Sequence, residues 1–314
     1  MSIKKGIGSF FLLFFGLASA VLASSRPREL WLKDLPAQDL LSLFETYDYN
    51  GALPLPDYRL PPIFLSRLPQ DLQQLPEETR KRLFIQILAP LALKVNEEIA
   101  RERRELLALQ TEFQSRKDLS APQMEALEAM ARKYDVFTRL QGYRRIERLL
   151  NALSDKVDAV PPSFLIAAAA IATDWGQSRP AREANSLYKE LVWHTDQGLL
   201  PEGEPADSDY RIRIFPDLYG AMTSYALKIN SSITYEQFRH LRRNIRYREK
   251  PLLGTETAHL MLLDTPLKNY AGLLQYTIAF YELNIIDKSK LNSKMIDKDL
   301  APNFAKFIQK DKNL

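Results

Sequence analysis

An uninterrupted apolar run over residues 164–172 constrains the fold of this chain more than any other stretch. Its sequence is Phe-Leu-Ile-Ala-Ala-Ala-Ala-Ile-Ala, and it follows Pro161-Pro162-Ser163. Proline in the first turn predicts a helix here, and apolar residues on every side predict that this helix is buried. The run is too short to span a membrane, which takes about 20 apolar residues.

Apolar residues at helical spacing predict a second long helix that begins at Pro76. We expect Pro90 to kink this helix or divide it in two, because proline removes a backbone hydrogen bond. Residues 96–117 are rich in Glu and Arg, which indicates a solvated helix. Further helices are expected after Ser120 and around Tyr143–Leu153, Tyr219–Ile229, Tyr235–Tyr247 and Asn269–Asn284.

Two segments, residues 187–194 and 209–215, alternate polar and apolar side chains. This period predicts strands, which we pair as a hairpin across an acidic link. Together the patterns predict a mainly α (α+β) fold: a helical domain with a small β-hairpin lobe, preceded by a helical N-terminal extension.

Residues 1–23 are typical of a secretory signal peptide, with Lys4 and Lys5 before an apolar run and small residues at its end. An uncleaved anchor is the alternative. Residues 24–140 are expected to form a Pro/Leu-rich arm and a helical extension, because dense proline prevents long helices and central strands. The arm should lie on the main domain, residues 141–286. The Lys-rich tail, residues 287–314, is expected to be loosely attached, with a short helix near Phe304–Ile308.

The composition excludes several classes of function. There are no cysteines, so a thiol nucleophile or a thiolate zinc site is impossible. The three histidines, His194, His240 and His259, show no metal-ligand spacing, so we expect no metal and no cofactor. The formal charge is only +4, which argues against nucleic acid as a partner.

A basic run over residues 239–248 is the strongest local concentration of charge. We interpret it as a solvated helix face, with contact to an acidic partner or an envelope phosphate as the alternative. Its cations are Arg239, Arg242, Arg243, Arg246 and Arg248.

The apolar helix ends in Ala170-Ile171-Ala172-Thr173-Asp174-Trp175-Gly176-Gln177-Ser178-Arg179. This stretch resembles the signature of bacterial cell-wall glucosaminidases, Ala-Gln-Ala-Ala-Leu-Glu-Ser-Gly-Trp-Gly-x-Ser-Arg. Residues 182–188 and 215–225 resemble later parts of that family's pattern. Residues 61–65, 82–84, 88–91 and 96–99 are similar to the N-terminal half of the Bax-type subgroup, whose members are exported.

The resemblance implies a lysozyme-like domain in which the hairpin forms one wall of a groove for the glycan strand of peptidoglycan. It implies a hydrolase that cuts next to N-acetylglucosamine, under a family label sometimes tied to amidase activity. In that family the signature Glu is the general acid. Here Ala172 occupies its place, and a methyl group cannot donate a proton.

Other carboxylates could replace the missing acid. Asp174 is rotated by roughly 200° from position 172 on a continuous helix, so only an altered helix end would bring it into the groove. Glu183 is expected to be structural. The remaining acids could supply a carboxylate from the hairpin or simply be solvated: Glu190, Asp196, Glu202, Glu204, Asp207 and Asp209.

Four residues are candidates for substrate binding by resemblance. Trp175 could stack on a sugar ring or pack in the core. Tyr225 could hydrogen-bond an N-acetyl group or be a core tyrosine. Asn185 is expected to brace the backbone after the apolar helix, and Tyr188 is expected to lie in the core.

Three hypotheses for function remain. The first is an exported protein of the periplasm or cell envelope that binds peptidoglycan glycan strands or an envelope protein, and is catalytically impaired. The second is an active, divergent glucosaminidase that uses Asp174 or a hairpin carboxylate. The third is a structural protein whose groove has closed. Membrane contact is expected only through an uncleaved signal.

Overall fold

The computed structural model describes residues 29–49, 58–194, 197–260, 269–296 and 302–309. The chain is mainly helical, with 62% helix and three small two-stranded sheets among the described residues. This confirms the mainly α fold class predicted from the sequence. The expected signal peptide, residues 1–23, lies outside the described residues. In the part of the chain that the structure covers, no helix combines the length and apolarity that a membrane crossing needs.

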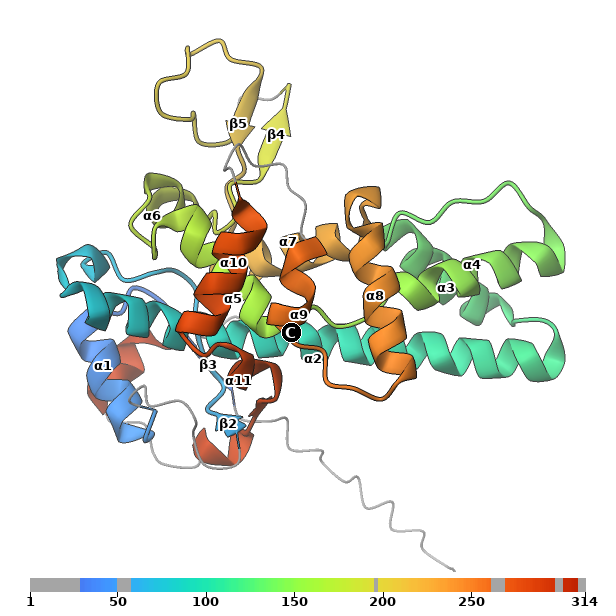
Figure 1. Cartoon of the computed structure of the whole chain (residues 1–314), viewed down its shortest axis with the longest axis horizontal. Coiled ribbons are helices and arrows are strands. Elements are labelled where there is room, and N and C mark those ends of the chain that lie inside the picture. Colours follow the sequence, from blue (N-terminus) through green and yellow to red (C-terminus); the bar gives the residue numbers. More distant parts are fainter. Residues whose placement is uncertain (1–28, 50–57, 195–196, 261–268, 297–301, 310–314) are drawn as a thin grey trace, which may run out of the picture.

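Helix α2 (Glu77–Arg116) runs along the length of the molecule (Figure 1). It continues through Pro90, so of the two outcomes expected for this proline, a kink or a division of the helix, the division does not occur. Proline at position 90 has no N–H for the carbonyl of Gln86. The hydroxyl of the buried Tyr49 donates to that carbonyl instead, at 3.1 Å. The side-chain amide of Gln86 donates in turn to the Tyr49 carbonyl, at 2.6 Å. A tertiary contact thus supplies the hydrogen bond that the helix lacks.

Apolar residues of the Pro/Leu-rich segment belong to the larger core cluster of the molecule. The short elements of this segment suit its proline content: β1 (Leu30–Leu32), α1 (Ala37–Thr46), β2 (Arg59–Leu60) and β3 (Ile63–Leu65). Strands β1 and β3 pair in parallel. All six residues of this pair are buried.

The tail is not loosely attached where the structure describes it. Strand β6 (Lys290–Leu291) pairs in parallel with β2. A 3-10 helix, Pro302–Phe307, confirms the expected short helix. The end of this helix is hydrogen-bonded to β1 and to the residue after it. The Lys33 N–H donates to the Phe307 carbonyl at 3.0 Å, and the Gln309 N–H donates to the Trp31 carbonyl at 2.9 Å. Sequence periodicity could not show this, because the tail is held by backbone pairing with residues far away in the chain.

The apolar residues form two clusters, one at each end of α2. The second half of α2 is not solvated on all sides, because Leu106, Leu109 and Phe113 pack into a cluster with α3 (Ala121–Lys133) and α4 (Gly142–Lys156). The larger cluster surrounds α5 (Pro162–Thr173). Its other helices include α7 (Leu218–Ser231), α8 (Glu236–Tyr247), α10 (Tyr270–Phe280) and α11 (Asn284–Asp287). The short helix α9 (Gly254–Thr257) contributes no residue to this cluster but contacts α5.

Helix α5 is the apolar helix of the sequence, and ten of its twelve residues are buried. Helices α2, α10, α11 and α9 pack around it. The prediction of a buried helix is therefore confirmed. Only Ile171 and Ala172, in its last turn, are partly exposed.

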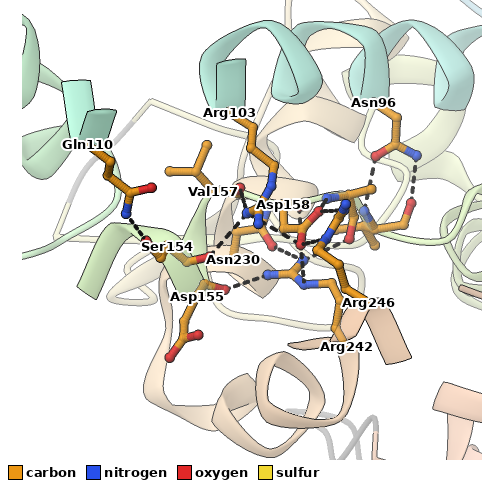
Figure 2. A network of polar contacts seen from close by, with 12 residues as sticks. Asn96, Arg103, Gln110, Ser154, Asp155, Val157, Asp158, Asn230, Arg242 and Arg246 are labelled. Atoms are coloured by element: carbon orange, nitrogen blue, oxygen red, sulfur yellow. Dashed lines mark hydrogen bonds and ion pairs between the residues drawn. The ribbon is translucent and has the colours of Figure 1, made fainter. Parts of the chain in front are cut away.

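The basic run on α8 is not simply a solvated face (Figure 2). The side chain of Arg242 is 2% exposed. Its guanidinium donates to the carbonyls of Asp158 and Ala159 at 2.9 and 2.7 Å, and to the side chain of Asn230 at 2.7 Å. Arg239 is also buried and donates to the Ile229 carbonyl. The expectation of a solvated face was wrong for these two arginines, because they satisfy backbone carbonyls of neighbouring segments.

The buried carboxylate of Asp158 lies at the centre of this arginine network. Arg246 donates to it through Nε at 2.7 Å, and Arg103 of α2 approaches to 3.4 Å. Burial by itself would raise the pKa of Asp158, but the hydrogen bond from Arg246 and the charges of Arg242 and Arg103 lower it below the usual value. The network joins α2, the α4–α5 link, α7 and α8.

Candidate functional site

The last turn of α5 carries Ala172, the residue at the expected general-acid position. Its side chain is a methyl group at a partly exposed place on an otherwise buried helix. Thr173 closes the turn, with its hydroxyl donating to the Ala169 carbonyl at 2.6 Å. The chain thus presents position 172 at the surface and gives it no titratable group.

Three consecutive residues in left-handed conformations end the helix: Asp174, Trp175 and Gly176, with φ of 49°, 55° and 84°. At Gly176 a Cβ atom would lie 2.9–3.1 Å from side chains of Leu72, Leu68 and Phe84, so glycine is required there. The Gly176 N–H donates to the Thr173 hydroxyl at 2.9 Å. This turn changes the direction of the chain.

Trp175 turns back onto the core. Its ring packs edge-on against Tyr281 at 4.6 Å and Phe84 at 6.0 Å between centroids. The ammonium of Lys81 lies 5.8 Å from the centre of the ring. The indole is partly exposed, so Trp175 both supports the end of α5 and presents an edge to solvent.

Asp174 is the residue at which α5 ends, and its side chain is exposed. The side-chain amide of Gln177 donates to its carboxylate at 2.9 Å. The helix end is altered, as a role for Asp174 would require, but its carboxylate lies in solvent and not against apolar residues.

Asn185 follows the short helix α6 (Arg179–Ala184) and also has a left-handed backbone. Its buried amide donates to the Phe215 carbonyl at 3.0 Å. The Phe215 N–H donates back to the Ala184 carbonyl at 2.9 Å. Asn185 thus braces the backbone between α6 and the segment that follows the hairpin.

Tyr188 and Tyr225 stack on each other, with centroids 4.0 Å apart and planes 13° apart. Tyr225 also stacks on Phe164 of α5 at 6.2 Å. The Tyr188 hydroxyl donates to the Leu165 carbonyl at 3.2 Å, roughly 10 Å before Ala172 along the helix axis. Burial, with neighbouring tyrosines, raises the pKa of Tyr225 well above its usual value. These two candidates lie mainly in the core.

The predicted hairpin is formed by β4 (Leu191–Trp193) and β5 (Tyr210–Ile212), which pair antiparallel. It projects from the helical body (Figure 1). Leu199, in the link between the strands, pairs with the other edge of β5 through two backbone hydrogen bonds to Ile212, at 2.9 and 2.8 Å. Trp193 is exposed.

Glu190 lies directly before β4 and is the carboxylate with the most unusual surroundings among the hairpin acids. Its side chain is 13% exposed. The Ser224 hydroxyl of α7 donates to Oε2 at 2.9 Å, and Arg213 approaches Oε2 to 3.7 Å while donating to Ser224 at 3.0 Å. The other oxygen, Oε1, is buried and has no hydrogen-bond partner among the described residues. Burial raises the pKa of Glu190, although Ser224, Arg213 and Lys228 act to lower it.

The other acids near the hairpin differ from Glu190. Glu183 is exposed and pairs with Arg179 at 2.9 Å. Glu204 is partly exposed, while Asp196 lies outside the described residues. Glu202, Asp207 and Asp209 are exposed. No group of three or more metal-binding side chains occurs within the described ranges.

Sequence reasoning placed Glu190 among the acids that could serve the hairpin, without distinguishing it from its solvated neighbours. A signal was available, because in the alternating segment 187–194 Glu190 falls on the same face of the strand as Tyr188 and Val192. What the sequence did not reveal is Ser224, 34 residues away, which donates to it.

One curated protein matches the chain: Protein bax of Escherichia coli (strain K12) is 26% identical over 224 residues. The match covers 70% of this chain and 75% of that protein. No protein-family profile matches the chain, and no solved structure matches it. The lysozyme-like character of the domain therefore stays a prediction. The chain is a distant homologue of Protein bax.

Proposed function

We propose that the chain is an exported protein that binds glycan strands of peptidoglycan and has lost the proton donor of a glucosaminidase. One observation carries this proposal. The end of α5 has the Trp175-Gly176 turn and Asn185 braces the backbone after α6, whereas position 172, partly exposed in the last turn of α5, is alanine.

Cleavage of a glycosidic bond needs one carboxylic acid, kept protonated, to assist the leaving oxygen. Loss of such a group typically lowers the rate by about 10²–10⁴-fold. Binding of the strand does not depend on that acid, because stacking and hydrogen bonding use other residues. Glycan binding with little or no cleavage is therefore the expected activity.

Export by the N-terminal signal would place the protein in the periplasm or cell envelope, where this polymer lies. An envelope protein bound in the same groove is the other partner that this proposal allows. The exposed Trp193 of the hairpin favours a glycan over a protein as the ligand, because an aromatic face can pack on a sugar ring.

Co-sedimentation with purified sacculi tests the proposal. The wild-type chain should sediment with sacculi, and Trp193→Ala should sediment less. Tyr247→Ala is a matched control, because Tyr247 is an exposed aromatic residue at the end of α8. Failure of the wild-type chain to sediment would overturn the proposal and favour a structural protein with a closed groove.

A second candidate function is hydrolysis with Glu190 as the proton donor. The raised pKa and the unpaired oxygen of Glu190 favour it, because a general acid must hold its proton near neutral pH. In this case the wild-type chain releases soluble muropeptides from sacculi. Glu190→Gln should then abolish release while leaving co-sedimentation intact, and unchanged release would exclude Glu190.

A further inference from the structure

A group of exposed apolar side chains lies on and beside the loop between α3 and α4, at the end of α2 that is far from α1 (Figure 1). Its members, which we call the loop patch, are Phe137, Leu140 and Tyr143. Phe137 is 76% exposed. Single exposed apolar residues are common on proteins, but a group of them marks a site of interaction.

The backbone of the loop is fixed where Phe137 leaves the core. Val136, directly before it, is buried in the smaller apolar cluster, and its N–H donates to the Ala131 carbonyl at 2.8 Å. The ammonium of Lys156 donates to the carbonyl of Asp135 at 3.0 Å. Because Val136 is anchored in the core, its neighbour Phe137 faces solvent from a well-held position.

Unbalanced positive charge surrounds the loop patch. Residues 132–148 contain six cations and only two carboxylates, Asp135 and Glu147. Lys133 and Arg145 pair with carboxylates of α2 and α3. The other four cations are exposed and form no ion pair with the described residues: Arg132, Arg139, Arg144 and Arg148.

The loop patch suits an extended surface better than a small molecule. The hollow beside Phe137 has a volume of about 110 Å³, well below the roughly 300–1,000 Å³ of ligand pockets. An anionic lipid surface accommodates both features of the patch, because apolar side chains enter the boundary of the acyl chains while arginines contact the phosphates. Tyr143 fits such a boundary, since its ring packs on Phe113 at 4.9 Å between centroids and its hydroxyl is polar.

The backbone of the loop limits how deeply it can enter a bilayer. Residues 137–141 are not helical, and unpaired N–H and C=O groups are not tolerated in hydrocarbon. Only the side chains of Phe137 and Leu140 can therefore pass the headgroups. This geometry gives a reversible attachment to the surface.

We propose that the loop patch and the four unpaired arginines beside it dock the protein on an anionic phospholipid bilayer. Phe137 and Leu140 insert into the acyl boundary, and Arg139, between them, binds lipid phosphates. The contact uses neither the hairpin nor the end of α5, so it is independent of the glycan binding proposed above. It is also separate from any contact made by the N-terminal signal.

Co-sedimentation with lipid vesicles tests this proposal, using the chain from Ser24 onward, the form expected after export. This form keeps every described residue and lacks the apolar run of the signal, which would bind lipid by itself. It should bind vesicles made of equal parts of phosphatidylglycerol and phosphatidylcholine, and bind vesicles of phosphatidylcholine alone more weakly. Added salt should weaken the binding, because salt screens exposed charges.

Two pairs of variants assign the binding to the loop patch. Phe137→Ser should weaken it about tenfold, the order expected from the burial of one phenylalanine. Its matched control is Phe280→Ser, at an exposed phenylalanine of α10. Arg139→Gln should weaken binding about fivefold, the effect of one cation near an anionic surface. Its control is Arg59→Gln, at an exposed arginine of β2, and both controls should bind as wild type does.

Three results overturn the proposal: no binding to the vesicles that contain phosphatidylglycerol, equal binding to the two kinds of vesicle, or equal binding by wild type and Phe137→Ser. A dimer in sedimentation velocity that Phe137→Ser abolishes, without vesicle binding, would assign the patch to a second copy of the chain and also overturn it. Sedimentation with sacculi should be the same for wild type and Phe137→Ser, so its failure in both bears on the proposed function alone.

Discussion

Two buried carboxylates, Asp158 and Glu190, show how differently one fold can treat the same chemical group. Asp158 is surrounded by arginines, and their hydrogen bond and charges hold its pKa below the usual value against the effect of burial. Glu190 has one hydroxyl donor and a more distant guanidinium, and burial raises its pKa. One of its oxygens has no partner among the described residues.

This difference suggests different roles: Asp158 stabilises the fold, whereas Glu190 is a candidate for a chemical role. Asp158 is ionised and joins four segments of the chain, so its interactions contribute to folding. Glu190 retains a proton more readily than an ordinary glutamate, and perturbed pKa values of this kind cluster at functional sites. A raised pKa in a buried group is a cost to folding that a structural role does not require.

The largest expected effect is that of Asp158→Ala. This substitution leaves the buried guanidinium of Arg242 without its nearest countercharge, and breaking a buried pair in this way typically costs about 3–5 kcal/mol. Urea unfolding should show this loss in the free energy of unfolding. A loss below about 1 kcal/mol would mean that the backbone carbonyls alone hold the arginines.

Glu190→Gln should have a smaller effect, and one that depends on pH. The raised pKa means that the native state binds more protons than the unfolded state above pH 4.5, so the contribution of Glu190 to stability is lost as pH rises through its folded-state pKa. The variant should be more stable than wild type at pH 8, because a neutral amide avoids the desolvation of the ionised carboxylate, and unchanged at pH 4. The free energy of unfolding of both proteins should be measured by urea unfolding from pH 4 to pH 8. If it changed with pH in the same way for the two proteins, the result would contradict this account.

Ser224→Ala tests the hydrogen bond to Glu190 directly. Removal of the hydroxyl takes away a donor that favours the ionised carboxylate, so the pKa of Glu190 should rise further. The free-energy change should be about 0.5–1.5 kcal/mol, the usual worth of one hydrogen bond. NMR titration of the Glu190 carboxyl carbon measures the shift, and a lowered pKa would show that the assigned contact is wrong.

The smallest expected effect is that of Arg243→Ala. Arg243 is adjacent to Arg242 in sequence, but its side chain is exposed and pairs with Asp155 at 2.7 Å. Exposed ion pairs contribute about 0–1 kcal/mol. Urea unfolding should therefore barely distinguish this variant from wild type, and a loss near that of Asp158→Ala would show that the network extends to the surface.

The sequence predicted the helices and the hairpin well because both depend on local periodicity. The buried helix over 162–173 and the strands at 191–193 and 210–212 follow from such patterns. What it could not predict depends on distant partners. Pro90 is tolerated through Tyr49, and Arg242 is buried because carbonyls of residues 155, 158 and 159 meet it.

The candidate site divides in the same way. Alanine at position 172 is visible in the sequence, as is the glycine after Trp175. The surroundings of Glu190 are not visible, because Ser224 and Arg213 reach it from other elements. Burial of a charged residue is decided by tertiary packing, which a single sequence does not record.

Release of soluble muropeptides from purified sacculi tests the central claim, the loss of the proton donor at position 172, most directly. Wild type and Ala172→Glu should be compared at equal concentration, after both are shown to sediment with sacculi. The account predicts that Ala172→Glu releases muropeptides about 10²–10⁴-fold faster than wild type. Equal release by the two proteins would contradict it.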